Sequence, residues 1–395
     1  MPILPMGIPQ DVDKFFYNRE KDLKKLKNYI NALNLNVAEQ ILVTGFRGVG
    51  KTYLLKKLAI DLPENILVAY VDISRVYGLQ KGVLTEELIM KEILSSLNQS
   101  INRKESYPSK LKRSLTNALG QINWKKYDFK EAGGILGVDI PQINDDYEKL
   151  SHFVMEFPQK IVDSSAGNLK GVLIIIDEFQ LIGELDNPNA FFWMIRSYTQ
   201  EQDNVTYIFT GSTSKTSAIV EMINGSKGAY GGRMIQFNVD PFSPSETQGY
   251  LAERVPEINF TSDGFERFYQ CTRGIPAYIN SFCNTLSAGE VYDEDRVRKT
   301  FFEKMDQITI MWIRIWGTLS PYEKDILINL ADSGSQTWTQ LLENTGQSRG
   351  TLTKYLDIIK NKGIVTIENK KYSIGDLMLE AWLKHRKELD GYYPP

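Results

Sequence analysis

The chain has 395 residues, of which 42% are hydrophobic and 24% are charged, and its formal net charge is -3. These are the values of an ordinary globular protein with room for two or three domains, and they exclude a polycation that binds nucleic acid over its whole surface. Two cysteines, Cys271 and Cys283, and two histidines, His152 and His385, are too few for a disulfide framework, a zinc site or a histidine-based catalytic centre.

The N-terminal segment has no features of a targeting signal. Its first ten residues, MPILPMGIPQ, are too short and too rich in proline for a signal peptide, and no apolar run in the chain approaches a membrane span. We therefore expect a cytoplasmic protein. An amphipathic helix is predicted over residues 20–33, and on physical grounds Asn18 is simply its N-cap.

A glycine-rich motif organises the next part of the chain. The stretch Ile41–Leu55, ILVTGFRGVGKTYLL, contains G-x-x-x-x-G-K-T between an apolar strand and a helix. Gly48 and Gly50 let the backbone bend so that its N–H groups point at phosphate oxygens, and the helix N-terminus adds partial positive charge. Lys51 can reach the β- and γ-phosphates, and the Thr52 hydroxyl can ligate Mg²⁺. A chance glycine-rich turn is a weaker explanation, because both flanking elements are present.

The elements that follow alternate between strands and helices. Strands are predicted over residues 65–72, 171–176, 205–210 and 234–239, and helices over residues 85–97, 145–161, 188–200 and 216–223. This alternation indicates a parallel sheet with helices on both faces. Between residues 98 and 144 the pattern weakens into a basic stretch with interleaved aromatic residues. A nucleic-acid contact is possible there, but a solvated insertion is the favoured interpretation.

Paired carboxylates follow the strand over residues 171–176. Asp177 would complete a Mg²⁺ shell together with Thr52, and Glu178 would orient and polarise an attacking water. This is the second half of a phosphate-loop ATPase site. The alternative, that both acids merely cap the strand end, is less favoured because the phosphate loop lies upstream.

Two further polar residues are candidates for the same site. Ser212 follows the strand over residues 205–210, where it would lie beside the γ-phosphate, although a plain turn residue explains it equally well. Arg233 lies between a helix and the last core strand. It could stabilise transition-state charge, even in a neighbouring subunit, but an ordinary surface arginine is the favoured interpretation.

From Ser243 the pattern is helical, with segments over residues 245–254, 262–272, 277–286 and 293–315. Gly274 and Pro276 are explained adequately by a corner between two of these helices. From Leu319, three helices over residues 320–330, 337–342 and 348–360 and a hairpin over residues 364–374 predict a winged helix-turn-helix.

This C-terminal segment is compatible with two kinds of partner. If it binds double-stranded DNA, its third helix presents Ser348, Arg349, Thr351 and Lys354 to the major groove, and its hairpin presents Lys370 and Lys371 to phosphate. Acidic residues are about as frequent as basic ones here, so a protein-contact module remains equally open.

Seven motifs together resemble those of the archaeal-type ATPases of the AAA+/STAND group, relatives of the origin-recognition ATPases. They are FYNREKDLKKL from Phe16, GFRGVGKT from Gly45, LIIIDEFQ from Leu173, IFTGS from Ile208, AYGGR from Ala229, DPFSPSE from Asp240 and RGIPAYI from Arg273. The resemblance spans about residues 14–385. It implies an α/β P-loop NTPase core with a parallel five-stranded sheet over residues 1–242, a helical lid over residues 243–318 and a winged helix over residues 319–395.

The resemblance also implies nucleotide contacts that the residues alone do not. The family's entry loop lies over the adenine, so Tyr17, Asn18 and Arg19 become candidates, although Asn18 stands where glycine is common. Pro276 matches the nucleotide-facing proline of the lid. Arg273 is not typical at its position and is a candidate sensor of the γ-phosphate. The remaining candidate contacts lie in the phosphate loop: Gly45, Arg47, Gly48, Val49, Gly50 and Tyr53.

Three functions follow from these features. The first is an ATP- and Mg²⁺-dependent switch that hydrolyses ATP slowly. The second is a DNA-binding regulator or loader in which ATP is a structural ligand. The third is a protein-interaction scaffold, and a homo-oligomer is compatible with each of them.

Overall fold

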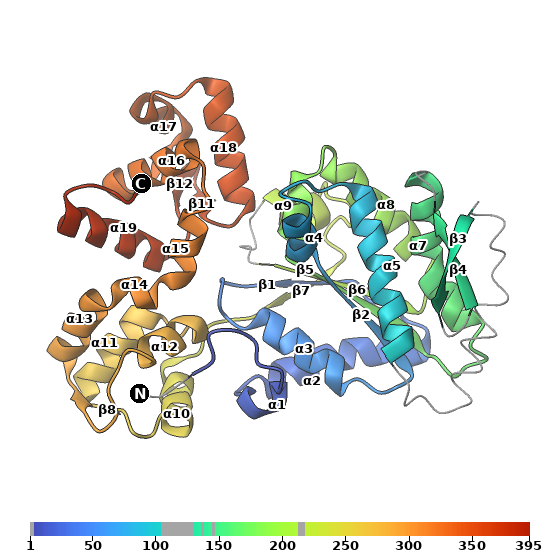
Figure 1. The fold of residues 1–395 in the computed structure, drawn as a ribbon, viewed down its shortest axis with the longest axis horizontal. Coiled ribbons are helices and arrows are strands. Elements are labelled where there is room, and N and C mark those ends of the chain that lie inside the picture. The colour runs from blue at the N-terminus through green and yellow to red at the C-terminus, as the bar shows by residue number, and fades with distance from the viewer. Residues whose placement is uncertain (1–3, 104–128, 136–137, 144–146, 212–217) are drawn as a thin grey trace.

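The computed structural model describes residues 4–103, 129–135, 138–143, 147–211 and 218–395. A sheet with helices on both faces forms one side of the molecule, and a helical segment and the C-terminal segment form the other (Figure 1). Within these described ranges, no helix is both long enough and apolar enough to cross a membrane.

The sheet contains five parallel strands, as the sequence predicts. Their order is β2-β5-β6-β1-β7, and they comprise β1 (Ile41–Thr44), β2 (Ile66–Asp72), β5 (Gly171–Asp177), β6 (Val205–Thr210) and β7 (Ile235–Asn238). The register pairs Asp72 with Asp177 and Asp177 with Thr210, so the carboxyl ends of three neighbouring strands meet at one edge. The phosphate loop leaves β1 at the same edge, because β1 is parallel to both β6 and β7.

Two separate apolar cores cover the faces of the sheet. Along β5, Leu173 and Ile175 pack in the cluster under α2 (Glu20–Asn31) and α3 (Lys51–Asp61), whereas Ile174 packs in the other cluster. This alternation is the period of two expected for a strand buried on both sides. The second cluster lies under α5 (Glu86–Arg103), α7 (Tyr147–Asp163), α8 (Pro188–Thr199) and α9 (Ala218–Asn224), on the opposite face of the sheet (Figure 1).

Short elements connect these layers. They are α1 (Val12–Phe15), the 3-10 helix η1 (Ala32–Leu35), α4 (Ile73–Leu79) and the 3-10 helix η3 (Phe179–Glu184). The predicted insertion is not featureless, because β3 (Phe129–Ile135) and β4 (Val138–Ile143) form an antiparallel pair. The sequence analysis missed both strands, since Gly133, Gly134 and Pro141 resemble breakers. Residues 104–128 of the insertion lie outside the described ranges.

The helical segment contains α10 (Pro244–Arg254), α11 (Ser262–Thr272), α12 (Pro276–Cys283), α13 (Glu294–Glu303), α14 (Met305–Ile308) and α15 (Ile310–Trp316). The strands β8 (Asn259–Phe260) and β9 (Val291–Tyr292) form a short parallel pair. The predicted single helix over residues 293–315 is wrong, because the chain leaves helical geometry at Lys304 and Thr309, where ψ is 13° and 12°. The Thr309 hydroxyl donates to the Met305 carbonyl, which is a local alternative to regular helix.

The C-terminal segment has the element order of a winged helix. It contains α16 (Pro321–Ser333), β10 (Gln336–Thr337), α17 (Trp338–Thr345), α18 (Arg349–Asn361), β11 (Val365–Glu368), β12 (Lys371–Ile374) and the unpredicted α19 (Leu377–Asp390). The strands form a sheet in the order β10-β12-β11. Asn369 and Lys370 adopt φ values of 50° and 63° in the hairpin turn, as a two-residue turn of this twist requires.

The helical and C-terminal segments share one continuous apolar cluster. A buried polar contact crosses it, in which the Tyr278 hydroxyl donates to Asp376 Oδ2 at 2.7 Å and accepts from Trp312 Nε1 at 2.5 Å. Asp376 also accepts from the backbone N–H groups of Met378 and Leu379 at the start of α19. The two segments are therefore joined by a polar network as well as by apolar packing.

Replacing Tyr278 with phenylalanine should destabilise both segments together. The substitution removes a donor to a buried carboxylate and leaves the Trp312 N–H without its acceptor, so we expect a loss of about 1–3 kcal/mol in the free energy of unfolding. Urea unfolding followed by tryptophan fluorescence measures this. Tyr355→Phe is the control, because Tyr355 is a half-buried residue of α18 whose hydroxyl lies outside the network. An equal loss of unfolding free energy in that variant would refute the role assigned to Tyr278.

Candidate functional site

The phosphate loop spans residues 45–50, between the last residue of β1 and the first residue of α3. Gly45 has φ = 148° and Gly48 has φ = 77°, conformations that a residue with a Cβ rarely adopts. A Cβ at Gly45 would lie 2.5 Å from the Val239 carbonyl oxygen, and one at Gly48 would lie 2.6 Å from Ala277 Cβ. These glycines therefore permit both the bend of the loop and the close approach of its neighbours.

Lys51 begins α3, and its side chain folds back into the loop. Its Nζ donates to the carbonyl oxygens of Gly45 at 2.9 Å and Phe46 at 2.8 Å. The residue is only 6% exposed, and burial lowers the pKa of its ammonium to about 8, against the opposing effect of the Glu178 charge. Because neutral carbonyls compensate a buried positive charge only in part, this ammonium favours binding of an anion.

Asp177 collects three hydrogen bonds at the end of β5. Its Oδ2 accepts from the Thr52 hydroxyl at 2.9 Å and from the Tyr70 hydroxyl at 2.5 Å, and its Oδ1 accepts from the Glu178 N–H at 2.9 Å. Burial raises the pKa of the Asp177 carboxyl, against the effect of the Tyr70 hydrogen bond. The sequence-predicted pair of Thr52 and Asp177 is therefore in direct contact.

Tyr70 is a site residue that the sequence analysis missed. It lies on β2 opposite Ile175, and a tyrosine inside an apolar strand resembles an ordinary core residue. The signal was its position two residues before the end of the strand. This position indicates a site residue only when β2 is known to pair with β5 in this register.

The donors at this edge fit Mg²⁺. The ion prefers oxygen ligands and is usually held by one or two carboxylates together with waters and substrate phosphates. Thr52 and Asp177 supply one hydroxyl and one carboxylate oxygen, 2.9 Å apart. Within the described ranges, no group of three or more His, Cys, Asp or Glu residues forms a cage that holds a metal alone. The chemistry of the donors therefore suits an ion that arrives with a nucleotide.

Glu178 follows Asp177 in a left-handed conformation, with φ = 55°. Its carboxylate accepts a hydrogen bond from the Gln180 side chain. Gln180 in turn packs tightly against Gly211 at the end of β6, where a Cβ would lie 1.9 Å from Gln180 Oε1. The predicted candidate Ser212 follows Gly211 and lies outside the described ranges.

A small cavity of about 100 Å³ lies beside the phosphate loop. Aromatic and apolar side chains form most of its wall, and its lining includes Phe16, Tyr17, Val49, Tyr53, Phe242, Tyr250 and Pro276. The ring of Tyr17 makes edge contacts with those of Phe242 and Tyr250. A planar apolar group such as a nucleotide base is therefore compatible with the cavity.

Arg19 links the entry segment to the phosphate loop and to the chain that follows β7. Its guanidinium donates to the carbonyl oxygens of Val49 at 3.2 Å and Asp240 at 2.7 Å, and it lies over the Phe242 ring at 4.8 Å. Asn18 adopts φ = 51°, so it takes the conformation that glycine favours. Asparagine tolerates this region better than most residues that carry a Cβ.

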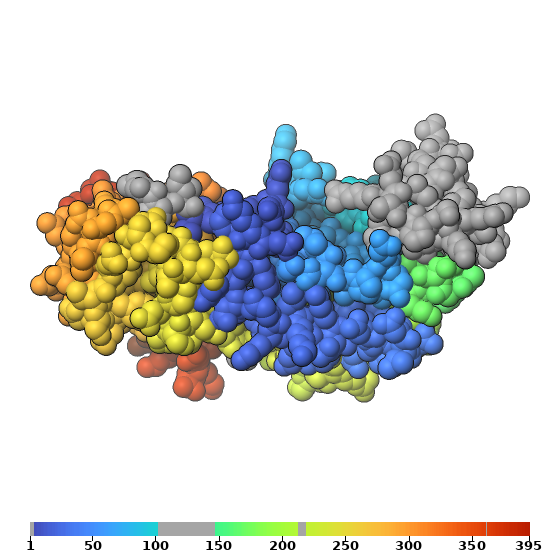
Figure 2. Space-filling model, turned by 90° about the horizontal axis from the view of Figure 1, so that it is seen from below, coloured from blue at the N-terminus to red at the C-terminus, as the bar shows by residue number. Residues whose placement is uncertain are grey.

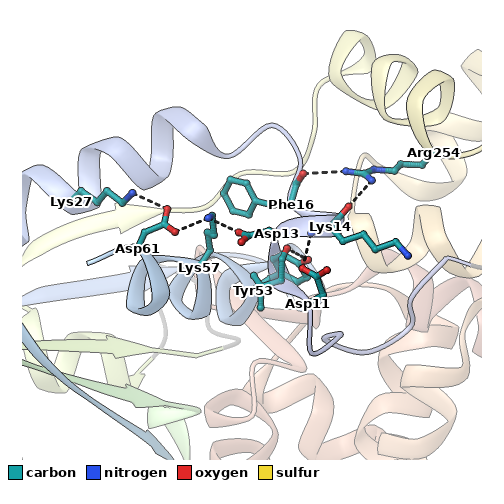
Figure 3. Close-up of polar contacts among 10 residues, drawn as sticks. Asp11, Asp13, Lys14, Phe16, Lys27, Tyr53, Lys57, Asp61 and Arg254 are labelled. Carbon is teal, nitrogen blue, oxygen red and sulfur yellow. Dashed lines mark hydrogen bonds and ion pairs between the residues drawn. The ribbon is translucent and has the colours of Figure 1, made fainter. Parts of the chain in front are cut away.

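The N-terminal segment is fastened over α3 and against the helical segment (Figure 3). The Tyr53 hydroxyl donates to the Val12 carbonyl at 2.6 Å, and Lys57 forms ion pairs with Asp13 and Asp61 at 2.5 and 2.6 Å. From α10, the Arg254 guanidinium donates to the carbonyl oxygens of two entry-segment residues, Lys14 at 2.8 Å and Phe16 at 3.1 Å. In the space-filling view, the blue N-terminal part of the chain lies directly against the yellow helical segment (Figure 2).

The helical segment also touches the phosphate loop directly. The Ala277 N–H donates to the Gly48 carbonyl at 3.2 Å, and Pro276 is the first residue of α12. Arg47 is half-buried at the tip of the loop. The structure therefore brings the candidate Pro276 to the loop and to the wall of the small cavity.

Arg233 occupies the other end of the sheet. It precedes β7, whose first residue, Ile235, is paired with Ile41 at the start of β1. The phosphate loop instead follows the end of β1. Arg233 is exposed, and the structure does not bring it together with Lys51, Thr52, Asp177 and Glu178.

The four basic residues proposed to contact DNA, Arg349, Lys354, Lys370 and Lys371, are all exposed on the C-terminal segment. Helix α18 also lies against η3 and α9 of the sheet body. The element that begins directly after Glu178 is thus in contact with α18, the third helix of the C-terminal segment.

Comparisons with known proteins agree with this architecture. A family model described as an ATPase domain predominantly from Archaea matches residues 16–282. Among solved structures, the chain resembles the Walker-type ATPase of Pyrococcus abyssi with a TM-score of 0.64 and 18% identity, over 96% of this chain and 99% of that chain. This identity shows a common fold and nothing finer.

Two further solved structures are more distant. The Aeropyrum pernix Orc1 protein in complex with DNA aligns with a TM-score of 0.46 and 13% identity, over 96% of this chain and 95% of that chain. Thermotoga maritima RuvB aligns with a TM-score of 0.43 and 14% identity, over 99% of this chain and 100% of that chain. Neither supports an argument about function. No curated protein matches the sequence.

The matched region of the family model contains the phosphate loop, both acids at the end of β5 and the first residues of α12. Because this match covers well over half of the chain, the protein belongs to the family of ATPase domains found predominantly in Archaea.

Proposed function

We propose that the protein is a molecular switch that binds ATP with Mg²⁺ between the sheet edge and the helical lid and hydrolyses it slowly. The observation that carries the proposal is the contact between Thr52 and Asp177 beside the buried ammonium of Lys51. These three groups converge at the carboxyl edge of a parallel sheet, where ligands of open α/β folds bind.

Each residue has a distinct task in the proposed reaction. Lys51 exchanges the carbonyls of Gly45 and Phe46 for the β- and γ-phosphates, which are better partners for a buried cation. Thr52 and Asp177 would hold the Mg²⁺, and the bound ion neutralises charge on the phosphates.

Glu178 orients the attacking water and takes its proton. In the structure its carboxylate accepts from Gln180, and the remaining lone pairs of its two oxygens can still take a proton from water. Gln180 therefore belongs with Ser212 among the polar groups proposed to act beside Glu178.

A bound nucleotide would contact several elements of the chain at once. The base cavity is walled by the entry segment, the phosphate loop and the lid, so a bound base touches all three. The lid bonds to the loop through Ala277 and Gly48, and α18 lies against η3 directly after Glu178. These contacts support a switch in which lid and winged helix respond to the nucleotide.

A second candidate function is DNA binding through the winged helix. It is favoured by the exposure of Arg349 and Lys354 on α18 and of Lys370 and Lys371 at the hairpin turn. From residue 319 onward the chain carries ten acidic and ten basic residues, so phosphate attraction is confined to these local positions. The same balance keeps a protein partner as the competing interpretation. Arg233, exposed at the far edge of the sheet, remains a proposed contributor to a neighbouring copy's site.

Replacing Lys51 with alanine should abolish tight ATP binding. Loss of the charge-assisted contact costs about 2–3 kcal/mol, which weakens binding by roughly 30- to 150-fold. Isothermal titration with ATP and Mg²⁺ measures this. Lys24→Ala, an exposed lysine on α2, is the control and should bind as wild type does. An unchanged dissociation constant for Lys51→Ala would rule out the phosphate-loop assignment.

Replacing Glu178 with glutamine should leave ATP binding intact and lower hydrolysis by roughly 10²–10⁴-fold, because the amide cannot take a proton from water. Single-turnover hydrolysis of bound ATP measures the chemical step. In the same samples, limited proteolysis reports whether ATP holds the lid in a protected arrangement. Equal single-turnover rates would remove Glu178 from the mechanism, and identical proteolysis with ATP, ADP and no nucleotide would sink the switch.

Replacing Tyr70 with phenylalanine should weaken metal binding to the ADP complex by roughly 10- to 100-fold, because a group that orients a metal ligand is lost. Electron paramagnetic resonance with Mn²⁺ measures the affinity without turnover. Tyr207→Phe is the matched control: Tyr207 is buried on β6, which is separated from β2 by β5, and its hydroxyl contacts the Met155 sulfur. The same Mn²⁺ affinity in Tyr70→Phe and wild type would show that the Tyr70 contact has no bearing on the metal.

A further inference from the structure

A second cavity, of about 920 Å³, lies between the lid and the winged-helix segment. Its wall comes from α11, α13 and α19, and it reaches Phe46 at the tip of the phosphate loop. Its volume lies near the upper end of the range of about 300–1,000 Å³ that is typical of ligand sites. It shares no lining residue with the base cavity, so it is a separate site.

Cations predominate in the wall of this cavity. Four basic side chains line it, from Arg267, Arg273, Arg298 and Lys384. Two acids, Asp376 and Glu380, also line it, so the basic side chains in the wall outnumber the acids by two. Three of the cations are ion-paired, Arg267 with Glu294, Arg298 with Asp295 and Lys384 with Glu380, whereas no ion pair in the described part of the chain engages Arg273. The wall therefore favours an anionic ligand.

Arg273 is the most conspicuous of these cations. It ends α11 in a left-handed conformation, with φ = 52°, which is unfavourable for a side chain with a Cβ. Its side chain is exposed, and no ion pair within the described ranges involves it. A strained backbone that presents an unpaired charge to a cavity points to a binding role.

Exposed aromatic rings accompany the cations. Phe46 is 54% exposed and Phe302 is 43% exposed, although large apolar side chains are usually covered. Phe46 belongs to the phosphate loop, and Phe302 is on α13, where its ring lies 5.1 Å from that of His385. The cavity thus offers ring faces together with positive charge.

We propose that this cavity binds a short stretch of single-stranded nucleic acid, DNA or RNA. Arginines and a lysine in a hollow that also presents aromatic faces are what such a strand requires, because its phosphates need cations and its unpaired bases need surfaces on which to stack. A duplex fits poorly, because its bases are already stacked and its grooves accept a protruding helix rather than a hollow.

The position of the cavity gives this binding a consequence. A strand that stacks on Phe46 touches the loop that surrounds Lys51, so its binding and that of ATP become coupled. The occupancy of the cavity itself does not depend on the proposed hydrolysis, and it is measured without nucleotide.

The test is fluorescence anisotropy with labelled oligo-dT and oligo-U of about 15 nucleotides at low salt, using the full chain. Arg298 and Lys299 are neighbours on α13 with side chains 63% and 75% exposed, and each is ion-paired with one acid, but only Arg298 lines the cavity. We expect Arg298→Ala to weaken binding about tenfold and to lower the slope of log affinity against log salt by about 0.7. Lys299→Ala should bind as wild type does.

Phe302→Ala tests the aromatic contribution separately, and we expect binding to weaken by roughly 5- to 100-fold. The cavity assignment is overturned if wild type does not bind either oligonucleotide, or if Arg298→Ala and Lys299→Ala lose equal affinity. It is also overturned if Arg349→Ala, on the winged-helix surface, abolishes binding while Arg298→Ala does not. Displacement of the oligonucleotide by polyglutamate at equal charge concentration would instead assign the cavity to acidic peptides.

Discussion

The Asp177 carboxylate accepts hydrogen bonds from two residues that are far away in the sequence, Thr52 on α3 and Tyr70 on β2, and from the adjacent N–H of Glu178. The Tyr70 contact requires the parallel register of β2 with β5, and the Thr52 contact requires the placement of α3 after β1. A slip of one residue between β2 and β5 would turn Tyr70 to the other face and deprive a buried carboxylate of a donor. The geometry of the site therefore depends directly on the topology and register of the sheet.

The phosphate loop and the acids were predictable because their chemistry depends on residues that are close in sequence. Gly48, Lys51 and Thr52 lie within five residues, and Asp177 and Glu178 directly end a run of six apolar residues. The strands were predictable for a similar reason, because a parallel strand buried on both faces is a continuous apolar run. Local patterns of this kind can be recognised without knowledge of contacts with distant parts of the chain.

The features that were missed depend on distant contacts or on competing local bonds. Arg19 was a candidate only through the family resemblance, and nothing around it in the sequence specifies its contacts with the carbonyls of Val49 and Asp240, 30 and 221 residues away. Asn18 resembled an N-cap, whereas the backbone places it in a left-handed turn before the helix. The breaks at Lys304 and Thr309 are invisible to a periodicity argument, since an amphipathic pattern continues through them.

The helical segment and the C-terminal segment share one apolar core, so they are packed together as a unit. At one end of this unit, α12 meets the phosphate loop where the Ala277 N–H donates to the Gly48 carbonyl. From the same helix, the contacts with Trp312 and Asp376 lead to α19. In the switch proposed above, a rotation of the helical segment about its connection to β7 would carry α18 with it, away from η3. The contacts that Tyr278 makes with Asp376 and Trp312 would then decide how much of that displacement reaches the end of the C-terminal segment.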